Sequence, residues 1–122
     1  MKVGFVLTPG MLTTGTAYPY EMWLAAKDML SAYKSEHQVN LYLIASSERI
    51  NTSRLPLKPN TSMSVAPSMD IVYLPALWRN PRKVLNRVSK KLNSWLIKNA
   101  KEGAEIAAVG SGVSLLARTG LL

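Results

Sequence analysis

The sequence contains no cysteine, and this absence excludes several kinds of chemistry at once. Without a thiol the chain forms no disulfide, offers no thiolate to a metal and has no cysteine nucleophile. Histidine is nearly as scarce, because His37 is the only one. A site with several histidine ligands is therefore excluded, and we expect neither a metal nor a cofactor.

Long hydrophobic runs are missing as well. No apolar run approaches the ~20 residues that a membrane-spanning helix requires, and the opening run over residues 2–7 ends in the turn signal Thr8-Pro9-Gly10. With 122 residues, of which 48% are hydrophobic, the chain is long and apolar enough to pack as one small domain over residues 1–122. We expect a cytoplasmic protein that does not contact a membrane.

Acidic residues are few, and the second half of the chain has a strong excess of positive charge. The sequence has 15 Lys and Arg against 7 Asp and Glu, a formal net charge of +8. Eight of the cations fall in one stretch: Arg79, Arg82, Lys83, Arg87, Lys90, Lys91, Lys98 and Lys101. Such a stretch is typical of a solvated helix face or of a surface that binds a polyanion. Because no known nucleic-acid-binding motif accompanies it, we favour the solvated face.

The hydrophobic pattern predicts strands that alternate with helices. Strands are expected over residues 2–7, 38–45, 70–75 and 104–109, with short edge strands near 50–57 and 62–65. Helices are expected over 19–34, 81–101 and 113–117, with Pro19 in the first turn of the first and Asn80-Pro81 at the start of the second. This alternation predicts an α/β fold, in which helices cover both faces of a mostly parallel sheet.

The most informative motif is the strand-to-helix turn at Gly110-Ser111-Gly112. Several α/β enzymes hold a strained nucleophile at such a turn, at the carboxyl edge of the sheet where ligands bind. Gly110 stands at that position and has no side chain. The amides of Ser111 and Gly112 are expected to face the site and to bind an anion or a carbonyl oxygen. A plain tight turn without a ligand is the alternative.

Three further side chains are candidates for function. Glu21 either projects toward the site as an acid or stabilises the positive end of a helix dipole. Trp78, which follows a strand, either lines a pocket or packs in the core. Ser111 would act as a nucleophile only with a base in reach, and we place His37 in a surface loop at the opposite, amino-terminal edge of the sheet.

Three segments of the sequence share order and spacing with a known family. They are VLTPG (6–10) with PYEMW (19–23), DIVYLPALW (70–78) with NP (80–81), and WL (95–96) with GAEIAAVGSGVSLLA (103–117) and GLL (120–122). Together they resemble the PfpI-type branch of the class I glutamine amidotransferase-like superfamily. More closely, they resemble the N-terminal domain of AraC-family transcriptional regulators. The resemblance implies a flavodoxin-like three-layer sandwich.

The departures from the family pattern concern its catalytic positions. Gly110 stands where enzymatic members have the elbow cysteine, and Gly15 stands where they have the acidic residue that supports it. Ala76 replaces a glycine whose amide helps to form the oxyanion hole. The family domain also continues beyond the matched segments, and the regulators add a helix-turn-helix domain. The resemblance therefore implies an N-terminal portion that is incomplete at its C-terminus and reaches DNA only through a domain absent from this chain.

These observations predict a non-catalytic, ligand-sensing and dimerising domain of an AraC-family regulator. We expect a homodimer that binds a small polar metabolite in a pocket lined by Gly15, Glu21, Ala76, Trp78, Gly110, Ser111 and Gly112. One alternative is a PfpI-like hydrolase, amidase or hydratase that uses Ser111. Another is a pure oligomerisation module without a ligand.

Overall fold

A parallel β-sheet forms the centre of the molecule. The computed structural model describes residues 1–47, 55, 57–88 and 90–122. In these residues the sheet has five strands in the order β3-β2-β1-β4-β5, and every neighbouring pair is parallel. The strands are β1 (Lys2–Leu7), β2 (Asn40–Ala45), β3 (Thr61–Ser62), β4 (Ile71–Leu74) and β5 (Glu105–Ala108).

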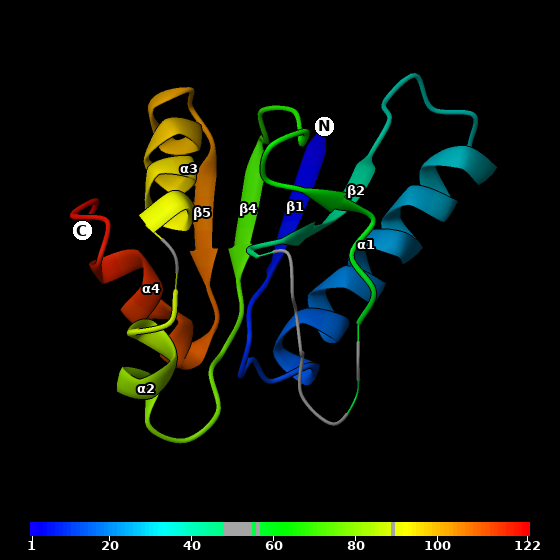
Figure 1. Ribbon diagram of the computed structural model, residues 1–122. Helices are drawn as coiled ribbons and strands as arrows, with labels where there is room; N and C mark the ends of the chain where they lie inside the picture. The colour runs from blue at the N-terminus through cyan, green and yellow to red at the C-terminus, as the bar shows by residue number, and fades with distance from the viewer. Residues whose placement is uncertain (48–54, 56, 89) are drawn as a thin grey trace.

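Helices cover both faces of the sheet, as Figure 1 shows. Helix α1 (Thr14–Ala32) lies on one face. The other face carries α2 (Pro81–Leu85), α3 (Lys90–Lys101) and α4 (Val113–Ala117), the last preceded by the 3₁₀ turn η1 (Gly110–Gly112). The predicted α/β architecture is confirmed, and its three layers match the flavodoxin-like arrangement.

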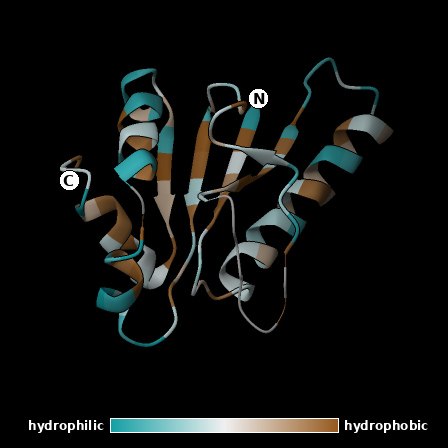
Figure 2. Ribbon diagram, in the orientation of Figure 1, coloured by the Kyte–Doolittle hydropathy of each residue, from teal (hydrophilic) through white to brown (hydrophobic). Residues whose placement is uncertain are grey.

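Alternating side chains of the strands build a separate core on each face. On the α1 side, Phe5 stacks on Tyr73 with ring centroids 5.0 Å apart, and Trp23 packs against the same cluster. On the other side, Val6 belongs to a cluster that includes Leu96 of α3. Because β1 is buried on both faces, its residues 3–7 form a continuous apolar run. Figure 2 shows the hydrophobic colouring of the central strands.

Helix α1 begins five residues earlier than predicted. Its first turn forms at Thr13, whose carbonyl accepts hydrogen bonds from the amides of Thr16 (3.0 Å) and Ala17 (2.8 Å). Pro19 therefore lies inside the helix and not in its first turn, as the sequence had suggested. Since proline has no N–H, the carbonyl of Gly15 lacks the usual helical donor four residues later.

The helix predicted over 81–101 is two helices. Asn80 caps α2 as predicted, because its Oδ1 accepts from the amide of Arg82 at 3.0 Å. However, α2 ends at Leu85, whose carbonyl accepts a hydrogen bond from the guanidinium of Arg118. The single-helix prediction is wrong: residues 86–88 form a turn, in which the amide of Arg87 donates to Val84 O, three residues back, at 2.9 Å.

The remaining elements are near their predicted places, and the strands among them are shorter than predicted. The strands expected over 38–45, 70–75 and 104–109 correspond to β2, β4 and β5, and α4 has its predicted bounds. Of the edge strand expected near 62–65 only Thr61–Ser62 is present, because residues 63–65 form a turn. The strand expected near 50–57 falls mostly outside the described residues. Among the described residues, none of the helices is long and apolar enough to cross a membrane.

Candidate functional site

Two loops are joined at the carboxyl edge of the sheet. The loop after β1 and the loop after β4 exchange backbone hydrogen bonds: the amide of Leu12 donates to Ala76 O at 2.8 Å, and the amide of Trp78 donates to Gly10 O at 2.9 Å. Met11 and Leu77 form an antiparallel bridge between them. Because β1 and β4 are neighbours in the sheet, their loops leave the same edge side by side.

The turn after β5 joins the same edge. The amide of Val109 donates to Leu74 O at 3.0 Å, and the chain then turns at Gly110, whose φ is +50°. A side chain at this φ is strained, which glycine avoids. A Cβ added to Gly110 would meet only the Cβ of Ala76, at 3.7 Å. The backbone turn typical of a nucleophile elbow is therefore present, with room for a side chain that the residue does not have.

Gly15 and Ala76 lie beside this turn. A Cβ on Gly15 would be 3.4 Å from the Cβ of Ala76 and 3.5 Å from Cγ1 of Val109. The three positions at which the sequence departs from the enzymatic pattern, Gly15, Ala76 and Gly110, are thus neighbours in space although they are distant in sequence.

The backbone amides that are free at this edge are not the ones that the sequence predicted. The amide of Gly112 donates to Val109 O at 2.8 Å inside the 3₁₀ turn, so the prediction that it faces the site is wrong. Among the described residues, the amides of Ala76, Gly110 and Ser111 have no hydrogen-bond acceptor. Sequence reasoning missed the Gly110 amide, although the first amides of any helical segment lack a partner within it.

Gly112 has a structural role instead. A Cβ at this position would lie 2.5 Å from Pro75 O and 3.0 Å from Leu74 O, and both are rigid backbone atoms. Only glycine allows η1 to approach the end of β4 this closely.

The hydroxyl of Ser111 holds the loop after β4. It accepts a hydrogen bond from the amide of Leu77 at 2.8 Å and donates one to the Leu77 carbonyl at 3.0 Å. His37 lies before β2, at the amino-terminal edge of the sheet as predicted, and its amide donates to Ser35 Oγ. The serine proton is therefore directed at a carbonyl, and the single histidine lies at the other edge of the sheet.

Glu21 and Trp78 are both exposed. Glu21 is two residues from Trp23, which packs on the sheet, and is therefore turned away from it by roughly 200° around the helix axis. It lies outside the first helical turn, so neither the acid role nor the dipole role predicted for it holds. Trp78 is 53% exposed, which excludes core packing and leaves it at the rim of the site.

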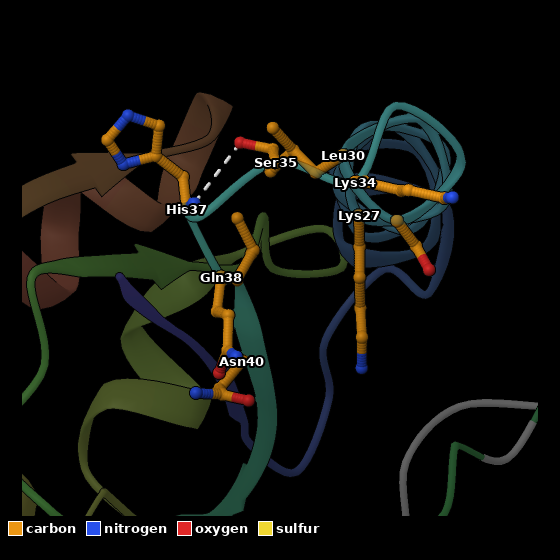
Figure 3. A pocket seen from close by; sticks show the side chains of 9 residues that line it. Lys27, Leu30, Lys34, Ser35, His37, Gln38 and Asn40 are labelled. Carbon is orange, nitrogen blue, oxygen red and sulfur yellow. Dashed lines mark hydrogen bonds between the residues drawn. The ribbon is translucent and has the colours of Figure 1, made fainter.

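Two hollows of the surface lie away from this edge. One, of about 310 Å³, lies between the end of α1 and the start of β2, and sequence reasoning missed it. Figure 3 shows that the side chains of Lys27, Lys34 and His37 point in different directions, so they do not form a common anion site. The other, of about 410 Å³, lies along the outer side of α3.

Solved structures share this architecture, whereas no family model and no curated relative matches the sequence. A protein of Vibrio parahaemolyticus described as a "putative transcriptional regulator protein" superposes with a TM-score of 0.83, at 16% identity over 100% of this chain. A two-domain protein of Anabaena variabilis, with DJ-1/ThiJ/PfpI-like and ferritin-like domains, gives a TM-score of 0.67 at 19% identity over 99% of this chain. The chain has the fold of a DJ-1/PfpI-like domain. A cysteine-to-alanine variant of a DJ-1 superfamily protein from Salmonella typhimurium agrees, with a TM-score of 0.62 at 18% identity over 99% of this chain.

The DJ-1/PfpI-like fold accounts for the position of the sequence motifs. Their loops follow β1, β4 and β5, which are adjacent parallel strands and so end at one edge of the sheet. The chain spans 62%, 32% and 62% of the lengths of the three matched proteins, less than two thirds of each. At these identities the likeness is one of fold.

Proposed function

We propose that this chain is a non-catalytic, ligand-sensing and dimerising domain of an AraC-family transcriptional regulator. The observation that carries the proposal is the turn at Gly110, which keeps the positive φ of an elbow but has no side chain that could react. The neighbouring positions Gly15 and Ala76 also lack reactive groups. The DJ-1/PfpI-like fold and the regulator-like description of the Vibrio parahaemolyticus protein support the same conclusion.

The ligand that suits this edge is a small carboxylate. The amides of Ala76, Gly110 and Ser111 are free donors, and the candidate acid Glu21 is exposed and turned away from the sheet. A hydrogen bond to a charged acceptor contributes about 1.5–3 kcal/mol, so two or three such amides are enough for binding in the millimolar to micromolar range. Trp78 at the rim would contact the apolar part of the ligand.

The dimerisation part of the proposal rests on α1. Its solvent side carries Tyr18, Met22 and Met29, and Tyr33 follows directly after the helix. Each of the four is at least 58% exposed, and they are spaced by four or seven residues. This spacing places them along one side of the helix, next to the side that packs on the sheet. A row of large apolar side chains is typical of a helix that packs against a second copy.

Ligand sensing would connect the site at the carboxyl edge with the dimer contact on α1. A ligand that binds one arrangement of the dimer more tightly shifts the population toward it, and the shift would alter DNA binding by a C-terminal domain of the intact regulator.

A thermal-shift screen tests the ligand part. The chain is mixed with a panel of mono-, di- and tricarboxylic acids, and we expect at least one to raise the melting temperature. The expected increase disappears in Gly110→Leu, whose side chain fills the site. Gly103→Leu is the matched control, because Gly103 also has a positive φ but lies at the amino-terminal edge before β5. No stabilisation by any acid, or equal stabilisation of the Gly110→Leu variant, would contradict the proposal.

A further inference from the structure

The positive charge of the molecule is concentrated in one segment. Between Asp70 and Glu102 the sequence has eight Lys and Arg residues and no Asp or Glu. Six of them lie within residues 79–91 and are exposed, and we call them the basic face: Arg79, Arg82, Lys83, Arg87, Lys90 and Lys91.

The packing of α2 and α3 turns these cations outward together. Val84 and Leu85 of α2 pack against the core, and so does Val88 in the turn that follows it. Arg82 and Lys83 of α2 and Arg87 of the same turn are exposed to solvent. In α3 the buried residues include Leu92, Trp95 and Leu96, while Lys90 and Lys91 form its exposed first turn. In Figure 2 both helices carry hydrophilic colouring on their outer turns.

Among the described residues, no carboxylate forms an ion pair with a cation of the basic face. In the part of the chain that the structure describes, the one recorded ion pair joins Lys98 and Glu102, outside the basic face. Arg118 donates to the carbonyl of Leu85 and so adds a seventh cation beside α2. Like charges concentrated in one segment repel one another, and a polyanion that binds them relieves the repulsion.

We propose that the basic face binds the phosphate backbone of duplex DNA without reading its sequence. Duplex DNA carries about one charge per 1.7 Å, and neutralising its phosphates releases condensed counterions, which drives binding. An anionic membrane suits this face less well, because the apolar sides of α2 and α3 are packed in the core and cannot insert between lipids. The proposal does not depend on the ligand site at the carboxyl edge.

Fluorescence anisotropy with a labelled duplex of about 20 base pairs tests the proposal. For four to six phosphate contacts, log K falls with log salt concentration with a slope of about −3.6 to −5.4. Affinity should therefore fall by roughly 100- to 2000-fold between 50 and 200 mM KCl. The affinity should be similar for unrelated duplex sequences, because phosphate contacts carry no sequence information.

A pair of triple variants locates the contact. The variant Arg82→Gln/Lys83→Gln/Arg87→Gln should reduce the magnitude of the salt slope by about 2.7. The control Lys27→Gln/Lys34→Gln/Lys58→Gln removes the same charge from exposed positions outside the basic face and should change the slope by less than about 1. Circular dichroism of both variants confirms that they fold.

Four results would overturn the proposal. The first is no binding of the duplex at 50 mM KCl, and the second is an equal reduction of the salt slope in the two triple variants. The third and fourth are tighter binding to vesicles containing phosphatidylserine, or to polyglutamate, than to the duplex.

Discussion

Two glycines two positions apart in the Gly110-Ser111-Gly112 turn have different functions. Gly110 is exposed and adopts a positive φ, and a side chain there would meet little. Gly112 is buried, and a side chain there would collide with the backbone of β4. We therefore expect substitutions of Gly110 to affect ligand binding and substitutions of Gly112 to affect folding.

Gly112→Ala should destabilise the domain by about 1–3 kcal/mol, because its Cβ would overlap Pro75 O and force the backbone to move. Gly15→Ala is the matched comparison. Its Cβ would make only ordinary contacts, and alanine favours the helix by up to about 1 kcal/mol. Urea unfolding of both variants measures the difference. Equal stability of the two variants would show that the approach of η1 to β4 is not essential.

Ser111→Ala should cost about 1–3 kcal/mol, since it leaves the amide and carbonyl of Leu77 without their partner. Ser94 provides a control, because its hydroxyl also bonds a backbone carbonyl but it is exposed on α3. Ser94→Ala should change the free energy of unfolding by less than about 0.5 kcal/mol. If Ser111→Ala is equally mild, the hydroxyl does not hold the loop.

At the level of the elements, Pro19 is the exception in α1. It interrupts the hydrogen bonding of a helix whose first turn is already formed at Thr13. Pro19→Ala should restore the bond to the Gly15 carbonyl and raise the free energy of unfolding by about 1–3 kcal/mol. Thermal unfolding followed by circular dichroism measures this gain. A loss of stability would mean that the proline ring contributes more through packing than it costs in hydrogen bonding.

The sequence predicted the elements whose signals are local. Periodicity alone placed β1, β2, β4, β5 and α4, because each strand or helix buries an apolar face of its own. It failed at the break between α2 and α3, which no proline or glycine marks. There the chain leaves the helix at residues 86–88, beside the contact between the Arg118 guanidinium and the Leu85 carbonyl, two residues that are far apart in the sequence.

The candidate site was also predicted only in part. The turn at Gly110 is visible in the sequence because glycines follow a strand of small apolar residues. The proximity of Gly110 to Gly15 and Ala76 follows from the resemblance to the PfpI-type family and from the order of the strands in the sheet. The hydrogen bond of the Gly112 amide and the outward direction of Glu21 depend on where a 3₁₀ turn and a helix begin, and local pattern does not fix helix starts.

At the level of the whole molecule, the exposed row on α1 predicts self-association. Met22→Glu/Met29→Glu should weaken the dimer at least tenfold, because two charges would be buried at its centre. Val65→Glu/Val113→Glu places the same charges on exposed apolar residues outside α1 and should leave the dimer unchanged. Analytical ultracentrifugation measures both. A wild-type chain that is monomeric at 100 µM or higher, or equal effects of the two variants, would contradict dimerisation through α1.

We propose that the carboxyl edge binds a small carboxylate through backbone amides and performs no reaction on it. An NMR titration of the ¹⁵N-labelled chain, with the carboxylic acid that gives the largest thermal shift, tests it most directly. We predict saturable shifts that are largest at the amides of Ala76, Gly110 and Ser111, with the acid recovered unchanged. Shifts confined to the hollow beside Lys27 and Lys34, or conversion of the acid to a product, would contradict the claim.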